Sequence, residues 1–238
     1  MNSLLESPRP SLGANVALFS LGKEDLEVLL VRPKGRPWKN TWVLPGGDVR
    51  RDEPLDRAAL RGLEQATGLD GVSLEQLGAY GEPGRDPRGH AVTVAYFSFT
   101  VAETRPFVPA DDVAEIRWHA LRSLDLDYEP HRARRVVSSG ARTRLGLDHA
   151  LIIEHARMRL QERLLRPTRW SSFELVPSRF TLTELQRVHE AVFGRSLDKR
   201  NFRSSLLARG IVEPVGASRR LGPRRPTQLY TWAQASGQ

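Results

Sequence analysis

The sequence predicts an α+β protein of two domains, a larger one built mainly from strands and a smaller one built from two helices and a hairpin. The length of 238 residues suits two modest domains. Strand-like segments dominate the first half, whereas after residue 180 the order is helix, glycine turn, helix, hairpin. Residues 151–238 contain 16 basic and 7 acidic residues, a net charge of +9; residues 1–150 contain 20 and 21, a net charge of −1. We expect the domains to span residues 1–166 and 167–238.

The first domain is expected to begin with a hairpin. Residues 14–21 and 26–31 are apolar and β-branched, and they flank the polar turn at residues 22–25. A short third strand is expected over residues 41–44, ending at Pro45-Gly46-Gly47. A helix is then predicted over residues 55–67, with Pro54 at its first turn and Gly68 as its C-cap. Later strands are expected over residues 72–80, 90–102 and 115–120, and a helix over residues 147–165.

The second domain has strong helix-capping signals. Thr181 and Glu184 have the spacing of a capping box and predict a helix to about Val192. Gly194 turns the chain, and Asp198 is placed to cap a second helix that Gly210 ends. Two short strands, 211–215 and 228–232, complete the pattern. This order predicts a winged helix-turn-helix.

A spaced motif lies around the predicted helix 55–67. Gly47 is followed after five residues by Glu53, then after seven by Arg61, and Leu63 and Gly68-Leu69 follow. This pattern resembles the Nudix box, and the resemblance implies a Nudix-like α/β/α sandwich over about residues 12–165. Nudix hydrolases carry glutamates where this chain has Gly62, Gln65 and Ala66. Those three positions share one helical face, and a magnesium site on that face would need acidic side chains there. We therefore expect no catalytic residues, no metal and no enzymatic activity.

The remaining cleft is expected to bind an anionic ligand. Backbone N–H groups around Gly46 and Gly47 can hold a phosphate, and Glu53 can pair with Arg61. Trp38 or Trp42 could stack on a base, although Trp42 fits the core equally well. The candidate ligand-binding residues are Arg32, Lys39, Gly46, Gly47, Glu53, Arg61, Arg85 and Arg88.

The second predicted helix of the small domain is amphipathic. Phe202, Leu206 and Leu207 are expected to form its buried stripe, opposite a basic and polar face. Such a face suits phosphates and base edges of DNA. Four arginines around Gly222-Pro223 form a basic hairpin tip. The candidate DNA-binding residues are Thr183, Lys199, Arg200, Asn201, Arg203, Ser204, Arg219, Arg220, Arg224 and Arg225.

Five stretches together resemble the Nudix-related transcriptional regulators, in which a Nudix-like domain is fused to a DNA-binding winged helix. They are residues 85–89 (Arg-Asp-Pro-Arg-Gly), 147–150 (Leu-Asp-His-Ala), 180–186, 197–203 and 225–230. The resemblance implies a homodimeric repressor of NAD-biosynthesis or sugar-utilisation genes. Its partners would be operator DNA and an effector such as ADP-ribose or a related nucleotide or sugar phosphate.

Composition excludes other classes of protein. There is no cysteine, which removes disulfides, thiol catalysis and Cys-ligated metals. The six histidines lack metal-ligand spacing. No apolar run approaches the ~18 residues of a membrane helix, and the N-terminal residues do not resemble an export signal. We expect a cytoplasmic protein without a cofactor.

Two alternatives remain open at this point. The chain could be an active Nudix hydrolase of nucleoside diphosphate derivatives with an accessory nucleic-acid-binding domain. That function would need a relocated base, for which Glu64 is the candidate. It could also be an inactive adaptor with neither ligand nor DNA.

Overall fold

The structure is a computed structural model that describes residues 9–22, 25–100, 106–126, 143–165, 175–219 and 226–233. The chain forms two compact units, and the division falls inside a helix, between Ala156 and Arg157. The ends of three strands are counted with the second unit. No helix within these described ranges is long and apolar enough to cross a membrane.

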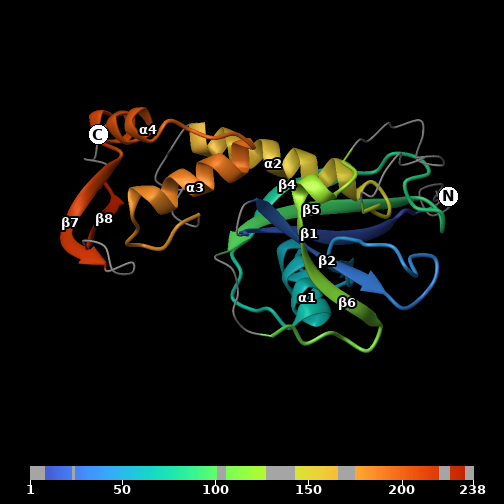
Figure 1. The fold of residues 1–238 in the computed structure, drawn as a ribbon. Coiled ribbons are helices and arrows are strands. Elements are labelled where there is room, and N and C mark those ends of the chain that lie inside the picture. The colour runs from blue at the N-terminus through green and yellow to red at the C-terminus, as the bar shows by residue number, and fades with distance from the viewer. Residues whose placement is uncertain are drawn as a thin grey trace, which may run out of the picture. The chain divides into compact units, whose positions relative to one another are not determined.

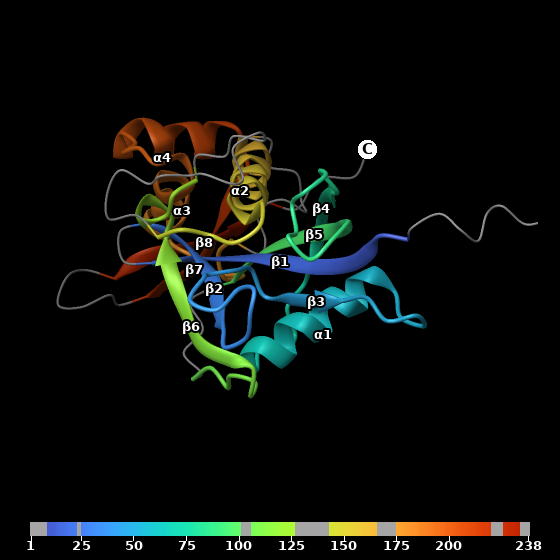
Figure 2. The ribbon, with the colours of Figure 1, turned by 90° about the vertical axis from the view of Figure 1, so that its right-hand side faces the viewer.

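The first unit is built on a six-stranded sheet with the strand order β4-β5-β1-β2-β6, and β3 pairs with β1 (Figure 1). The strands are β1 (Ser11–Leu21), β2 (Leu26–Pro33), β3 (Gly46–Asp48), β4 (Glu75–Tyr80), β5 (Ala91–Thr100) and β6 (Val113–Ala120). Helix α1 (Leu55–Thr67) lies on one face of the sheet, and α2 (His149–Leu165) begins on the opposite face (Figures 1 and 2). This arrangement confirms the predicted α/β/α sandwich.

The strand expected over residues 41–44 is wrong. Trp42 and Val43 make only isolated bridges, to Leu145 and Val31. The paired strand is the glycine-containing β3, in which Gly46 lies opposite Asn15 of β1. A side chain at Gly46 would meet the backbone of Ala14 and the Cα of Asn15. Glycine is therefore required by the close approach of two strands, which a search for β-branched residues cannot detect.

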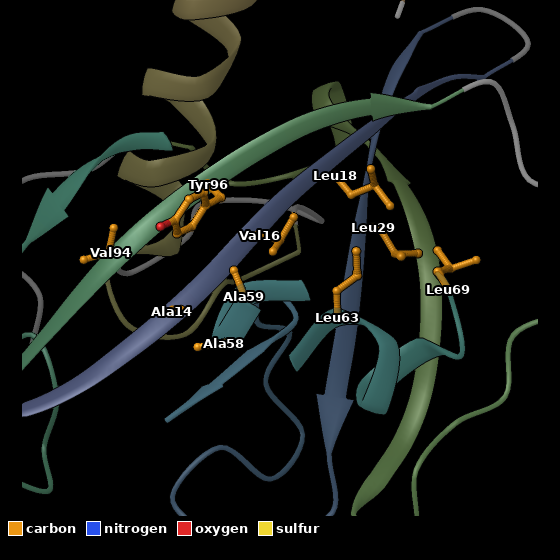
Figure 3. Packing of buried hydrophobic residues seen from close by; sticks show 10 residues of the cluster. All are labelled: Ala14, Val16, Leu18, Leu29, Ala58, Ala59, Leu63, Leu69, Val94 and Tyr96. Atoms are coloured by element: carbon orange, nitrogen blue, oxygen red, sulfur yellow. The ribbon is translucent and has the colours of Figure 1, made fainter. Parts of the chain in front are cut away.

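Helix α1 has the predicted bounds and packs its apolar face against the sheet. Gly68 ends it in the left-handed conformation at φ 76°, as a C-cap glycine does. Ala58, Ala59 and Leu63 are fully buried and face residues of β1, β2 and β5, among them Val16, Leu18, Leu29, Val94 and Tyr96 (Figure 3). This cluster is the core of the first unit.

The second unit contains α3 (Leu182–Phe193), α4 (Lys199–Ala208) and an antiparallel pair, β7 (Val212–Arg219) and β8 (Thr227–Trp232). The capping box is complete, with the Thr181 hydroxyl accepting from the Glu184 N–H and the Glu184 carboxylate accepting from the Thr181 N–H. Asp198 caps α4 by accepting from the Asn201 N–H at 2.7 Å. The order of elements confirms the predicted winged helix-turn-helix.

The predicted apolar stripe of α4 is only partly correct. Leu206 is buried and Phe202 is half-buried, but the side chain of Leu207 is 47 % exposed. Leu207 follows Leu206 directly and so points about 100° away from it around the helix. The buried stripe of α4 therefore rests on Phe202 and Leu206.

The contact between α1 and β3 predicts the effect of a small substitution. A Cβ added at Gly62 would lie 2.6 Å from the Gly46 carbonyl carbon and 2.9 Å from the Gly47 nitrogen. Alanine in place of glycine within a helix should raise the free energy of unfolding by about 0.5–1 kcal/mol. Overpacking the added Cβ against the backbone should lower it by about 1–3 kcal/mol. We expect Gly62→Ala to lower the free energy of unfolding, measured by urea denaturation.

The control is Gly78→Ala in β4, where an added Cβ meets nothing within 4 Å. This control should be neutral or slightly stabilising. A stabilised Gly62→Ala protein would contradict the close packing of α1 on β3.

Candidate ligand cleft and nucleic-acid interface

The first unit contains a cleft of about 660 Å³ beside α1. Its walls come from the end of β2, residues 43–50, the inner face of α1 and residues 110–113. Of the predicted ligand-binding residues, Gly46, Gly47 and Arg61 line this cleft. Arg50 and Gln65 also line it, although the sequence predicted no ligand-binding role for Arg50 and indicated Gln65 only as a replaced catalytic position.

Arg61 is held in place by the segment that precedes α1. Its Nε donates to Glu53 Oε2 at 2.9 Å, and its Nη2 donates to Glu53 Oε1 and to the Asp48 carbonyl. Glu53 also accepts from the Arg50 N–H at 2.7 Å. The hydrogen bonds from Arg61, and then that from the Arg50 N–H, lower the pKa of Glu53 to about 2. Glu53 therefore positions Arg61, and both of its carboxylate oxygens already accept hydrogen bonds within the protein.

The face of α1 toward the cleft does not fit a divalent metal ion. Gly62 is pressed against the backbone of Gly46 and Gly47, and Ala66 offers only a methyl group. The Gln65 side-chain oxygen accepts from Arg61 Nη1 at 3.1 Å. Nowhere in the described part of the chain do three His, Asp or Glu side chains gather as metal ligands. Hard cations need several oxygen ligands, which this face does not supply.

The same face can donate hydrogen bonds. Because the Gln65 oxygen is taken by Arg61, its amide NH₂ group is the part left to donate. Arg50 is exposed at the cleft, and the Arg61 side chain is 20 % exposed. Asp48 and Asp112 also line the cleft, so its positive charge is limited. Directed N–H donors suit a diphosphate better than a metal ion here.

Arg32 and Lys39 lie outside the residues that line the cleft. The Arg32 guanidinium pairs with Glu115 at 2.6 Å and lies 5.5 Å from the centre of the Trp42 ring. Lys39 is exposed. Trp42 is half-buried and makes an edge contact with His119, with 4.4 Å between ring centres. Trp42 therefore packs within the protein in this structure.

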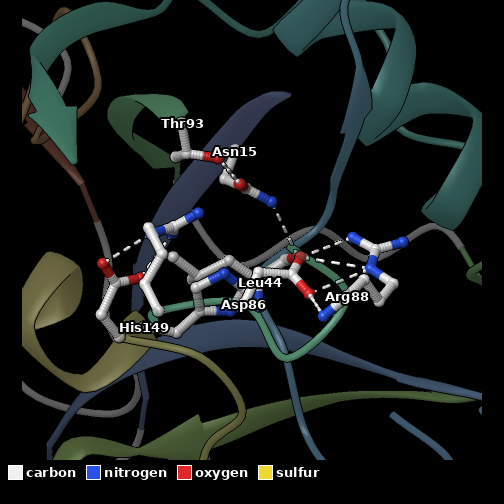
Figure 4. A network of polar contacts seen from close by, with 8 residues as sticks. Asn15, Leu44, Asp86, Arg88, Thr93 and His149 are labelled. Atoms are coloured by element: carbon white, nitrogen blue, oxygen red, sulfur yellow. Dashed lines mark hydrogen bonds and ion pairs between the residues drawn. The ribbon is translucent and has the colours of Figure 1, made fainter. Parts of the chain in front are cut away.

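The placement of Arg85 disagrees with the ligand-binding role expected for it. Its side chain is 3 % exposed, and its Nε and Nη2 donate to the two carboxylate oxygens of Asp148 at 2.8 and 2.5 Å. The loop between β4 and β5 folds inward at this residue, which a polar, glycine-rich sequence did not indicate. The Arg88 side chain is 59 % exposed and pairs with Asp86 (Figure 4). Neither arginine lines the cleft.

His149, the first residue of α2, is tied to the cleft wall. Its Nδ1 accepts from the Leu44 N–H at 2.8 Å (Figure 4), and Leu44 lines the cleft. Complete burial lowers the pKa of His149 to about 4, an effect that the carboxylate of Asp148 opposes. The imidazole is therefore neutral at physiological pH. From the sequence, residues 147–150 were recognisable only as a stretch of family resemblance.

The second unit presents the predicted polar face of α4. Lys199, Arg200, Asn201 and Ser204 are exposed. Arg203 is half-buried, and its Nη2 donates to the Thr183 hydroxyl of α3 at 3.0 Å. The structure thus joins two of the predicted DNA-binding residues.

Arg219, at the end of β7, forms hydrogen bonds within the second unit. Its Nη1 donates to Glu184 at 2.9 Å, and its Nη2 donates to the Arg179 carbonyl. These bonds connect the hairpin to the capping box of α3. The remaining predicted hairpin arginines, Arg220, Arg224 and Arg225, lie outside the described residues.

Comparisons with known proteins agree with both halves of this description. Family models match for the NUDIX domain over residues 11–139 and for the NrtR DNA-binding winged helix domain over residues 172–232. The chain is 33 % identical over 230 residues to the ADPR responsive transcriptional repressor NtrR of Acinetobacter baylyi, covering 95 % of this chain and 83 % of that protein.

Two solved structures of Shewanella oneidensis NrtR are similar to it. The complex with a 27mer DNA has a TM-score of 0.68 at 29 % identity and 93 % coverage of both chains. The NUDIX domain complexed with ADP ribose has a TM-score of 0.52 at 29 % identity, covering 65 % of this chain and 90 % of that one.

The burial of His149 predicts a pH dependence of stability. Its pKa falls from 6.5 to about 4 on folding, so the unfolded chain binds the proton more tightly. The stabilisation is present above pH 6.5 and is lost as the pH falls toward 4, by about 3 kcal/mol in total. We expect His149→Asn to lose this part of the pH dependence of unfolding, because asparagine does not titrate. A ring signal of His149 titrating near pH 6.5 in NMR spectra would contradict the burial.

Proposed function

Because this chain belongs to the Nudix-related transcriptional regulators of the NrtR type, we propose that it is a repressor that binds operator DNA through its winged helix and responds to ADP-ribose or a closely related nucleotide. Residues 1–166 would form the sensing domain and residues 167–238 the DNA-binding domain. The observation that carries the proposal is the cleft side of α1, where Gly62, Gln65 and Ala66 replace the acidic face of a hydrolase.

The sensing role follows from what this face can and cannot do. Phosphoryl chemistry on a diphosphate needs a metal ion to stabilise charge and activate water, and these side chains cannot hold one. Arg50, Arg61 and Gln65 can instead hold a diphosphate by direct hydrogen bonds. A cleft of about 660 Å³ lies within the usual range for a nucleotide-sized ligand, about 300–1,000 Å³. The chain would therefore bind its effector without cleaving it.

The proposed effector site keeps part of the predicted residue set. Gly46, Gly47 and Arg61 would contact the effector, together with Arg50 and Gln65, and Glu53 would orient Arg61. Arg32, Lys39 and Arg88 would require loop movement to take part. Arg85 is left out because it is committed to Asp148.

The DNA-binding role rests on the exposed polar face of α4. Lys199, Arg200, Asn201 and Ser204 would reach phosphates or base edges, and Arg203 would do so from its bond to Thr183. Arg219 would act by fixing the hairpin, and Arg220, Arg224 and Arg225 would add phosphate contacts. We further propose that the protein is a cytoplasmic homodimer controlling genes of NAD metabolism, because paired half-sites about one helical turn apart need two winged helices.

Removal of one exposed arginine from α4 should weaken DNA binding. Arg200→Ala is expected to raise the operator Kd by a factor of about 5–150, because a lost base contact costs about 1–3 kcal/mol. The control is Arg209→Ala, nine residues later and therefore on the opposite side of the helix. Fluorescence anisotropy with a labelled operator duplex measures both. Equal affinity of Arg200→Ala and the unmodified protein would remove α4 as the recognition helix.

Effector binding should not depend on a divalent cation. Isothermal titration with ADP-ribose is expected to give the same Kd in EDTA and in magnesium, because no carboxylate face is present to bring the ion to the diphosphate. Chromatography of the same samples should show intact ADP-ribose. Magnesium-dependent release of AMP and ribose 5-phosphate would instead establish the hydrolase alternative.

A further inference from the structure

Two stretches of the sequence, residues 85–89 and 147–150, have no part in the cleft or in the DNA-binding face. The structure joins them through the buried pair Arg85–Asp148, whose side chains are 3 % and 2 % exposed. Arg85 uses both Nε and Nη2 to reach the two oxygens of Asp148. This two-point geometry fixes the direction of the pair as well as its distance.

The next residue connects this pair to the effector cleft. His149 accepts from the Leu44 N–H, and Leu44 is followed after one residue by Gly46 and Gly47 of the cleft wall. A shift of the cleft wall at Leu44 would therefore move or break its hydrogen bond to His149, the first residue of α2. Among the described residues, the buried His149 Nε2 has no hydrogen-bond partner, so within that part of the chain the imidazole is held by its hydrogen bond to Leu44.

The backbone just before α2 is also unusual. Leu147 has φ 56°, a left-handed conformation that residues with a side chain rarely adopt. Gly146 beside it is closely packed, since an added Cβ would lie 3.1 Å from the Trp38 ring. Such conformations persist where neighbouring contacts impose them, and they concentrate at switch regions. The Arg85–Asp148 pair and the His149–Leu44 bond directly follow Leu147 in the chain, and just before it the Gly146 N–H donates to the Trp42 carbonyl at 2.9 Å.

Helix α2 extends from this point to Leu165 without a break. Its residues from Arg157 onward are counted with the second unit. There Gln161 Nε2 donates to the Val192 carbonyl at the end of α3, at 3.0 Å. One continuous helix thus begins at the cleft wall and ends in a hydrogen bond to the winged helix.

We propose that Arg85, Asp148 and His149 are positioning residues that couple occupation of the effector cleft to DNA binding, by linking the cleft wall at Leu44 to the start of α2. The inference rests on the proposed function and adds the residues through which effector binding would change DNA binding. A buried ion pair is weak evidence for stability alone, because apolar residues of similar volume often stabilise a core as well or better. The directional geometry of the Arg85–Asp148 pair suits a start of α2 that has two discrete arrangements, one for the free and one for the occupied cleft.

The test uses full-length variants of His149 that differ in one property. His149→Phe removes the acceptor for the Leu44 N–H, whereas His149→Asn keeps a side-chain oxygen at the same distance along the chain as Nδ1. Arg88→Ala is the matched control in the same loop as Arg85: it breaks the Asp86–Arg88 ion pair, in which the Arg88 side chain is 59 % exposed and the Asp86 side chain 4 % exposed. For each protein, operator Kd is measured without and with saturating ADP-ribose, and ADP-ribose Kd is measured separately.

In the unmodified protein the two operator Kd values should differ by a factor of roughly 5–150. For His149→Phe this ratio should fall to about one, while operator affinity without effector and ADP-ribose affinity stay within about threefold of the unmodified values. His149→Asn and Arg88→Ala should keep the ratio. An unchanged ratio in His149→Phe would overturn the coupling role but not the proposed function. A ratio of one in the unmodified protein would overturn both.

Hydrogen exchange on the unmodified protein keeps the proposal testable if His149→Phe does not fold. ADP-ribose should change amide protection at Leu44 and in the first turn of α2, as well as around the cleft. Changes confined to the cleft wall, with the first turn of α2 unaffected, would overturn the coupling role.

Discussion

The close approach of α1 to β3 is the constraint on which the first unit depends. Gly62 faces Gly46 with no room for a side chain between them, so the helix lies directly on the strand backbone. One residue earlier, Arg61 reaches the Asp48 carbonyl and Glu53, which fixes the segment leading into the helix. Together these contacts hold a cleft open beside α1. They also explain why a glutamate at position 62 would not restore a metal site, because the position has no space for it.

Local signals in the sequence predicted the helices well, and contacts between distant segments were the features that it could not supply. The Thr181–Glu184 capping box and the Gly68 C-cap depend on neighbours within four residues, and both occur as expected. Strand β3 is defined by its fit to Asn15, more than thirty residues away. Arg85 looked like a loop cation because its partner, Asp148, is 63 residues distant. Arg50 was not predicted as a cleft residue because the family pattern assigns no role to that position, and Gln65 was interpreted only as the loss of a catalytic glutamate.

Charge in this chain is divided between groups used internally and groups left exposed. Arg61, Arg85 and Arg219 each make at least two hydrogen bonds to described partners, so they organise the fold around the cleft and the winged helix. Lys199 and Arg200 remain exposed, where their charge can meet a polyanion. Net charge therefore indicates the partner of the second unit, but only the bonding of each cation separates a contact residue from a supporting one.

In the proposed function, a nucleotide that is bound but not cleaved changes the affinity of the same chain for operator DNA. This coupling can be measured in both directions. By thermodynamic linkage, the factor by which the nucleotide changes operator affinity equals the factor by which the operator changes nucleotide affinity. The most direct measurement is ADP-ribose titration of the free protein and of the protein saturated with operator duplex. We expect the two Kd values for ADP-ribose to differ by the same factor as in the converse titration, roughly 5–150. Identical Kd values for ADP-ribose with and without operator would contradict it.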